Sequence, residues 1–285
     1  MNYVDVFYRS NDGLRLYARD YPGPDVKAPV LLCLPGLTRN SKDFAALAEH
    51  LRNTHRVLCP DQRGRGRSAR DTDATRYRPD QYATDMVTLL DLLGISRAVV
   101  IGTSLGGMMA IILMATQPHR IAAAVLNDMG PEIDPRGLAR IAGYVGKTAP
   151  VKDWNEAAEQ AAHTNGVAFP DYQIDDWQAM ARDVYVQEGT TPLLDYDPAI
   201  ALGMSTGTVA PDLWPLFEQV GGKPMLVIRG ETSDILSAKT LTEMSRRLPH
   251  LVVQNIPGRG HAPTLNEPAA RAAIGQFFDG LGTIA

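Results

Sequence analysis

The fold is decided by one stretch of the chain, Ala98-Val99-Val100-Ile101-Gly102-Thr103-Ser104-Leu105-Gly106-Gly107, and by the apolar run that follows it. The stretch opens with mostly β-branched residues, and the run from Met108 to Ala115 is rich in helix-forming residues. The 19 residues from Ala98 to Thr116 carry no charge, a length that could cross a bilayer. However, Gly102, Ser104 and the glycines after them interrupt the segment. We therefore predict a buried strand that runs directly into a buried helix.

A G-x-S-x-G pattern, Gly102-Thr103-Ser104-Leu105-Gly106, lies at the junction between this strand and this helix. The pattern is typical of a serine on a sharp strand-to-helix turn, where only small neighbours fit and the hydroxyl is lifted out of the sheet. The amide of Leu105 and the positive end of the helix point at the same place. These features predict that Ser104 is a nucleophile. The alternative is a glycine-rich helix start that only packs tightly or binds phosphate.

Strands and helices alternate along most of the chain. A β-hairpin is predicted for residues 4–8 and 14–21, because Asn11-Asp12-Gly13 joins two alternating segments. Further apolar runs predict strands at 30–34, 56–59, 98–102, 121–126, 224–229 and 251–256, and helical spacing predicts helices at 41–53, 80–93, 105–117, 238–248 and 267–281. This order predicts an α/β fold with a mostly parallel eight-stranded sheet covered by helices on both faces.

The segment from Pro131 to about Pro211 departs from this alternation. It shows helical stretches at 136–145, 152–163 and 175–186 and no convincing strand, and it holds 12 acidic against 5 basic residues. We predict an all-helical cap at residues 131–211, inserted into a core domain formed by residues 1–130 and 212–285. An apolar pocket is expected between cap and sheet. The cap's aromatic residues are candidates to line it: Tyr144, Trp154, Phe169, Tyr172 and Trp177.

The composition excludes several classes of protein. The 285 residues are 45% hydrophobic and 21% charged, which suits a globular chain and not a disordered one. The net charge of −4 provides no broad positive field for a nucleic-acid backbone. A structural loop is therefore the favoured interpretation of the basic cluster formed by Arg63, Arg65, Arg67 and Arg70. The partner we expect is a small-molecule substrate, with no nucleic acid and no membrane.

Location and metal content are predicted from what the sequence lacks. The N-terminal segment Met1 to Ser10 alternates polar and apolar residues and has no continuous apolar core, so a secretory signal is not expected. The two cysteines, Cys33 and Cys59, lie in apolar runs and are expected to be buried reduced thiols, which suits a cytoplasmic protein. No histidine pair or cysteine cluster has the spacing of metal ligands. We expect no metal and no cofactor.

Four segments in order resemble the α/β-hydrolase family, across nearly the whole chain. Leu34-Pro35-Gly36-Leu37 is similar to the family's loop after its third strand, and the stretch from Asp61 to Ser68 resembles its D-x-R-G-x-G-x-S motif. Gly102 to Gly106 resembles the nucleophile elbow, and Gly260-His261 the loop of the catalytic histidine. The chain has Pro35-Gly36 where the family usually has His-Gly. That departure bears on loop geometry more than on chemistry, since the histidine is generally not a reacting group.

The resemblance implies a Ser, Asp, His order for the triad. His261 is then the base that takes the proton of Ser104 and returns it later. Asp234, just past the strand 224–229, is the acid that we favour, and Asp128, at the end of the strand 121–126, is the alternative. The oxyanion hole is expected to consist of the backbone amides of Leu37 and Leu105.

The function predicted from this set is hydrolysis of a small carboxylic ester or lactone through an acyl-enzyme. The same triad would also serve a carbon–carbon bond hydrolase, a thioesterase, an amidase or an acyltransferase. A non-catalytic ligand receptor on the same fold is a further alternative. Dehalogenase and epoxide-hydrolase activities are disfavoured, because the resemblance implies aspartate at the elbow for those relatives and this chain has Ser104. Either a monomer or a homodimer is compatible with the sequence.

Overall fold

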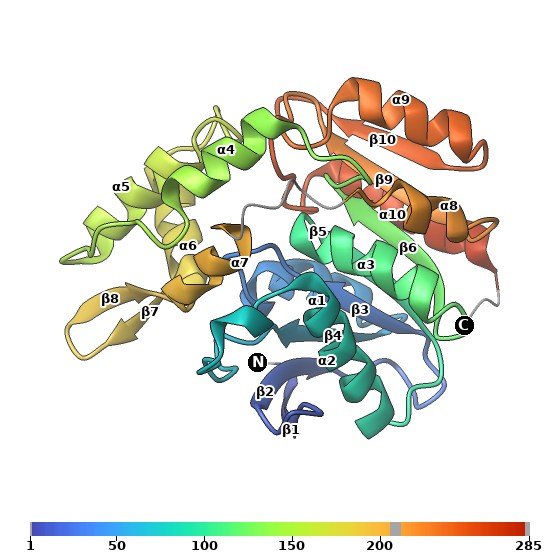
Figure 1. The fold of residues 1–285 in the computed structure, drawn as a ribbon, viewed down its shortest axis with the longest axis horizontal. Coiled ribbons are helices and arrows are strands. Elements are labelled where there is room, and N and C mark those ends of the chain that lie inside the picture. The colour runs from blue at the N-terminus through green and yellow to red at the C-terminus, as the bar shows by residue number, and fades with distance from the viewer. Residues whose placement is uncertain (1, 206–211, 283–285) are drawn as a thin grey trace.

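An eight-stranded sheet forms the centre of the molecule (Figure 1). The computed structural model describes residues 2–205 and 212–282. The strand order is β1-β2-β4-β3-β5-β6-β9-β10, and all neighbours are parallel except the pairs β1–β2 and β2–β4. The strands are β1 (Val4–Arg9), β2 (Arg15–Tyr21), β3 (Val30–Leu34), β4 (Arg56–Asp61), β5 (Ala98–Thr103), β6 (Ile121–Asn127), β9 (Met225–Gly230) and β10 (Val252–Ile256). The predicted mostly parallel sheet of eight strands is thus confirmed.

Helices cover both faces of the sheet, which explains why its central strands are apolar on both sides. In β3, Leu31 and Cys33 pack into the apolar cluster on one face, while Leu32 and Leu34 pack into the cluster on the other. The first cluster includes α1 (Ala45–Leu51) and α10 (Pro268–Leu281). The second includes α2 (Pro79–Leu92), α3 (Leu105–Thr116), α8 (Trp214–Gln219) and α9 (Ala238–Arg247). No described helix has the length and apolar composition that crossing a bilayer requires.

The elements between Pro135 and Ser205 form a separate group beyond one end of the sheet (Figure 1). Its elements are α4 (Pro135–Tyr144), α5 (Trp154–Asn165), α6 (Ile174–Val184), β7 (Tyr185–Glu188), β8 (Thr191–Leu194) and α7 (Leu202–Ser205). Much of this group packs around its own apolar cluster, to which Phe169, Trp177 and Met180 belong. Ile141 and Ile200 pack instead against the cluster of the sheet. The division into a core and a cap at residues 131–211 remains a prediction, and residues 206–211 lie outside the described part.

The prediction that this segment is all-helical is wrong. Strands β7 and β8 form an antiparallel hairpin with Tyr185 opposite Leu194 and Glu188 opposite Thr191. Gly189 follows β7 with a φ of 57°, a left-handed conformation that glycine adopts without steric cost. A hairpin forms here, in place of a continued helix, because β-forming side chains flank a two-residue turn. The sequence indicates this hairpin by apolar residues on either side of Gly189. The helical spacing just before them, however, predicts a helix that continues to residue 186.

Candidate active site

Ser104 lies at the sharp turn where β5 ends and α3 begins. Its backbone has a φ of 54° and a ψ of −117°, a conformation that non-glycine residues rarely adopt and that must be stabilised by the surrounding structure. The flanking glycines make the turn possible. A Cβ on Gly106 would lie 2.0 Å from the carbonyl oxygen of Leu34, and a Cβ on Gly102 would lie 2.2 Å from that of Gly106. Both glycines of the G-x-S-x-G pattern are therefore required by backbone packing.

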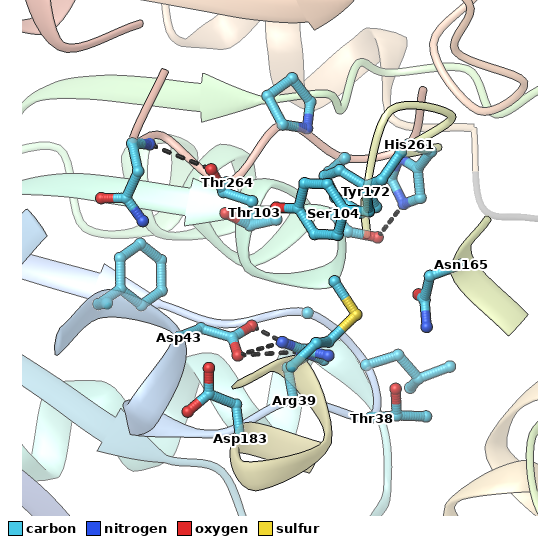
Figure 2. A pocket seen from close by; sticks show the side chains of 18 of the residues that line it. Thr38, Arg39, Asp43, Thr103, Ser104, Asn165, Tyr172, Asp183, His261 and Thr264 are labelled. Carbon is cyan, nitrogen blue, oxygen red and sulfur yellow. Dashed lines mark hydrogen bonds and ion pairs between the residues drawn. The ribbon is translucent and has the colours of Figure 1, made fainter. Parts of the chain in front are cut away.

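The structure brings Ser104 and His261 together from opposite ends of the sequence. The Oγ atom of Ser104 lies 2.8 Å from Nε2 of His261, as Figure 2 shows. On the other side of the imidazole ring, Nδ1 lies 2.7 Å from Oδ2 of Asp128. Asn127 anchors the loop that carries His261, because its side-chain amide donates to the carbonyl of Pro263 at 2.7 Å. A hydroxyl, an imidazole and a carboxylate thus form one continuous hydrogen-bonded chain.

Asp128 is held in place by several hydrogen bonds at the end of β6. The residue is fully buried and has a φ of 55°. Its Oδ1 accepts a hydrogen bond from the amide of Gly230 at 2.9 Å, and its Oδ2 accepts one from the hydroxyl of Ser233 at 2.5 Å. Buried carboxylates need such donors, because an unpaired charge in the interior is costly. The donors leave Oδ2 positioned to accept the Nδ1 proton of His261.

Our preference for Asp234 as the acid is corrected by this arrangement. Asp234 pairs instead with Arg140 of α4, at 2.6 Å from Nε and 2.8 Å from Nη2. The Arg140 guanidinium lowers the pKa of the Asp234 carboxyl, with a smaller opposing effect of burial. The ends of β6 and β9 are neighbours in the sheet, so both carboxylates lie near His261. The bidentate ion pair turns Asp234 toward the helix, and Asp128 alone contacts the imidazole.

The loop that carries Leu37, which we predict to supply one amide of the oxyanion hole, lies beside Ser104. A Cβ on Gly36 would lie 3.7 Å from the Cβ of Ser104, so this loop passes directly beside the serine. The Gly36 carbonyl accepts a hydrogen bond from the Arg39 amide at 3.2 Å. In a trans peptide, N–H and C=O point in opposite directions, so the Leu37 N–H points away from that bond. The Leu105 N–H belongs to the first turn of α3, where amides lack helical acceptors.

Two buried side chains from the basic loop after β4 form hydrogen bonds to the backbone of the Leu37 loop. Nε2 of Gln62 donates to the carbonyl of Pro35 at 3.2 Å, and Nε of Arg65 donates to the carbonyl of Leu37 at 2.8 Å. The two peptide groups that flank the Gly36–Leu37 peptide are therefore anchored. The neighbouring Arg63 has a structural environment of its own, since it pairs with three carboxylates, those of Asp12, Asp71 and Asp85. The basic cluster is thus a structural loop, as predicted, but no pattern in the sequence indicates the contact between Arg65 and Leu37.

A cavity of about 320 Å³ opens in front of Ser104 and His261. The Leu37 loop and the histidine loop form part of its wall. Residues of α4, of α6 and of the segment 165–172 form the part contributed by the predicted cap. Three of the five aromatic candidates line it: Tyr144, Phe169 and Tyr172. Trp177 packs inside the cap cluster, and Trp154 lies under the guanidinium of Arg182, 4.0 Å from the ring centroid. The predicted pocket between cap and sheet exists, with fewer aromatic residues than expected.

Charged side chains gather at the end of this cavity away from His261 (Figure 2). Arg39 binds Asp43 through Nε and Nη2, with distances of 2.7 to 2.9 Å. Asp183 of α6 lines the same region, and no described residue donates a hydrogen bond to its carboxylate. Burial raises the pKa of Asp183 to about 6, and the charge of Asp43 adds to this shift while Arg39 opposes it. Neither Arg39 nor Asp183 was identified from the sequence, where no motif marks them.

Because the folded state raises the pKa of Asp183 above its usual value of 3.8, ionisation of this carboxyl destabilises the fold. The cost is absent below about pH 4 and complete above about pH 6. We expect Asp183→Asn to increase the free energy of unfolding by about 1–2 kcal/mol at pH 8 and by much less at pH 4. Urea unfolding at both pH values measures this difference. Asp175→Asn, an exposed change on the same helix, is the control. An equal gain for Asp183→Asn at both pH values would contradict the prediction.

The cysteines lie apart from this site. Cys33 and Cys59 are buried in β3 and β4 and form no disulfide bond. Burial raises the pKa of the Cys59 thiol, and a hydrogen bond with Cys33 adds to the shift. In the part of the chain that the structure describes, no three His, Cys, Asp or Glu side chains come close enough to hold a metal ion.

Comparisons with known proteins identify the family of the chain. The family model described as "alpha/beta hydrolase fold" matches residues 29–268. A 3-hydroxybutyrate-oligomer hydrolase of Cupriavidus necator is 35% identical over 280 residues, covering 94% of each chain. A 2-(acetamidomethylene)succinate hydrolase of Mesorhizobium japonicum is 30% identical, covering 88% of each. The crystal structure of an alpha/beta hydrolase from Novosphingobium aromaticivorans superposes with a TM-score of 0.92 at 46% identity, covering 98% of each chain. The chain belongs to the alpha/beta hydrolase family, and like its named relatives it is a hydrolase.

Proposed function

We propose that the protein hydrolyses small carboxylic esters or lactones through an acyl-enzyme intermediate on Ser104. The observation that supports this most is the hydrogen-bonded chain from Ser104 through His261 to Asp128. The relative at 35% identity is named for the hydrolysis of 3-hydroxybutyrate oligomers. That name supports oligoesters of a short hydroxy acid as the first substrates to test.

The first half-reaction forms the acyl-enzyme. Oγ of Ser104 attacks the ester carbonyl carbon while Nε2 of His261 accepts its proton. Asp128 accepts the Nδ1 proton in a hydrogen bond, which fixes the tautomer and stabilises the imidazolium. The negative charge on the carbonyl oxygen is stabilised by the amides of Leu37 and Leu105. When the tetrahedral intermediate collapses, the imidazolium gives its proton to the leaving alkoxide, and the alcohol departs.

The second half-reaction releases the acid and restores the enzyme. Water attacks the acyl carbon, and Nε2 of His261 accepts one of its protons. Collapse of this second intermediate breaks the bond to Oγ, and the imidazolium returns the proton to Ser104. In a lactone the leaving alcohol remains attached to the acyl chain, so one hydroxy acid is the sole product. No cofactor takes part in either half of this scheme.

A fluorophosphonate tests the proposal directly, since it reacts with an activated serine. We expect one adduct per chain, which peptide mass spectrometry locates at Ser104, together with hydrolysis of p-nitrophenyl butyrate. Ser104→Ala is the control, because it removes only the Oγ atom. An unlabelled wild-type protein whose hydrolysis rate equals that of Ser104→Ala would refute the proposal. Labelling at another serine would refute the assignment of the nucleophile.

A further inference from the structure

The cavity has two chemically different ends. Ser104 and His261 lie at one end, and Arg39, Asp43 and Asp183 lie at the other (Figure 2). Because His261 protonates the leaving group, the leaving group must lie on the histidine side of Ser104. A group that reaches Arg39 and Asp183 therefore belongs to the acyl portion of the substrate. The charged end of the cavity is thus placed to select the acyl chain.

The aliphatic part of the Arg39 side chain starts close to Ser104. A Cβ placed on Gly36 would be 3.7 Å from the Cβ of Ser104 and 3.5 Å from the Cγ of Arg39. The side chain of Arg39 consequently begins beside the serine. Because this side chain leads from the neighbourhood of Ser104 to the charged end, an acyl chain that lies along it would reach the Arg39 guanidinium.

Arg39 and Asp183 have complementary unused hydrogen-bonding capacity. Asp43 occupies Nε and Nη2 of Arg39, and among the described residues no acceptor contacts Nη1. Asp43 thereby fixes the guanidinium plane of a side chain that lines the cavity, and Nη1 is left without a described acceptor. The Asp183 carboxylate supplies acceptors beside it that no described donor occupies. A ligand group that both accepts and donates a hydrogen bond would satisfy the two side chains at once.

The charges decide between the possible groups. A carboxylate would accept from Arg39, but it would bring a third negative charge next to Asp43 and Asp183. Arg39 is the only arginine or lysine among the described residues that line the cavity, and Lys42 and Arg19 act on Asp183 from outside that lining. An ammonium group would donate to Asp183, but it cannot accept from Arg39 and would face its positive charge. A hydroxyl group is neutral and both donates and accepts. It is the simplest group that uses both unused sites without adding charge.

We propose that Arg39, Asp43 and Asp183 form a subsite that binds a hydroxyl group on the acyl chain, so that esters of short hydroxy acids are the preferred substrates. This inference rests on the proposed ester hydrolysis at Ser104. Arg39 Nη1 donates to the hydroxyl oxygen, and the hydroxyl proton is donated to the Asp183 carboxylate. Asp43 does not contact the hydroxyl and acts as a positioning residue that orients Arg39.

Three p-nitrophenyl esters with the same leaving group test the subsite: the 3-hydroxybutyrate, the butyrate and the hemisuccinate. We expect kcat/KM for the 3-hydroxybutyrate to exceed that for the butyrate about tenfold, the effect of one hydrogen bond to a charged group. In Asp183→Ala this ratio should fall toward one, and in Asp183→Asn, whose neutral amide oxygen can still accept a hydrogen bond, it should fall less. Asp175→Asn lies on the same helix and removes the same charge outside the cavity, so it should keep the wild-type ratio.

Two results would overturn the subsite: a butyrate hydrolysed as efficiently as the 3-hydroxybutyrate, or a preference for the anionic hemisuccinate over both. Calorimetry with Ser104→Ala tests binding without turnover, using methyl 3-hydroxybutyrate and methyl butyrate as ligands. Tighter binding of the hydroxylated ester, lost in Ser104→Ala/Asp183→Ala, supports the subsite, and equal binding refutes it. If the wild-type protein hydrolyses none of the three esters, the proposed function fails, and calorimetry still decides the subsite.

Discussion

Asp128→Asn is expected to lower kcat for p-nitrophenyl butyrate about 10⁴-fold, whereas Asp234→Asn should leave it within about threefold of the wild type. An asparagine at position 128 can donate a hydrogen bond to Nδ1 of His261, which favours the tautomer with its proton on Nε2. That tautomer cannot accept the proton of Ser104. The variant also loses the charge that stabilises the imidazolium.

Asp234→Asn removes half of an ion pair with Arg140, and both side chains are about one quarter exposed. Pairs of this kind contribute up to about 1 kcal/mol to stability. Asp128→Asn is therefore expected to affect the chemical step. Asp234→Asn is expected to affect only a contact between α4 and the loop after β9. Thermal unfolding of both proteins is the control, since Asp128 is also buried. A larger loss of kcat in Asp234→Asn than in Asp128→Asn would show that the acid has been wrongly assigned.

The second large effect is expected from Arg65, which does not line the cavity. We predict that Arg65→Lys lowers kcat about 100-fold with a small change in KM, which approaches the loss of one oxyanion-hole donor. A lysine keeps the charge but cannot reproduce the three hydrogen bonds to the Leu37 carbonyl, the Arg63 carbonyl and the Tyr82 hydroxyl. Without them the Leu37 amide is free to move from the position where the oxyanion develops.

A second measurement separates a displaced Leu37 amide from a general loss of stability. A trifluoromethyl ketone forms a hemiketal with Ser104 whose oxyanion occupies the same hole. Its affinity should fall by about the same factor as kcat/KM in Arg65→Lys. Arg70→Lys, an exposed change in the same loop, is the matched control and should behave as wild type. Retention of inhibitor affinity in Arg65→Lys, with a lower unfolding temperature, would assign the residue a purely structural role.

The sequence predicted the sheet, the elbow and the histidine loop because each depends on local patterns. Continuous apolar strands, two glycines around Ser104 and the Gly260-His261 pair are visible without knowledge of tertiary contacts. The choice between the two candidate acids was not decided in this way. Asp128 and Asp234 follow neighbouring strands, and only the tertiary partners distinguish them: Ser233 for the first and Arg140 for the second.

The grouping of Arg39, Asp43 and Asp183 at one end of the cavity could not be predicted from the sequence, for a related reason. Arg39 and Asp43 follow β3, and Asp183 comes from α6, about 140 residues later in the chain. Their proximity depends on how α6 is placed over the Leu37 loop, which no pattern encodes. Arg65 was visible as part of a basic cluster, but its contact with the Leu37 carbonyl follows from burial, which charge counting does not reveal.

The two consecutive residues Ser233 and Asp234 bond to different parts of the molecule. The hydroxyl of Ser233 donates a hydrogen bond to the Asp128 carboxylate, while Asp234 forms an ion pair with Arg140 on α4. Ile141 of the same helix forms part of the cavity wall. Any shift of α4 would therefore be transmitted to the turn that positions Asp128 beside His261. The helix over the cavity and the hydrogen-bond partner of His261 are coupled through two consecutive residues.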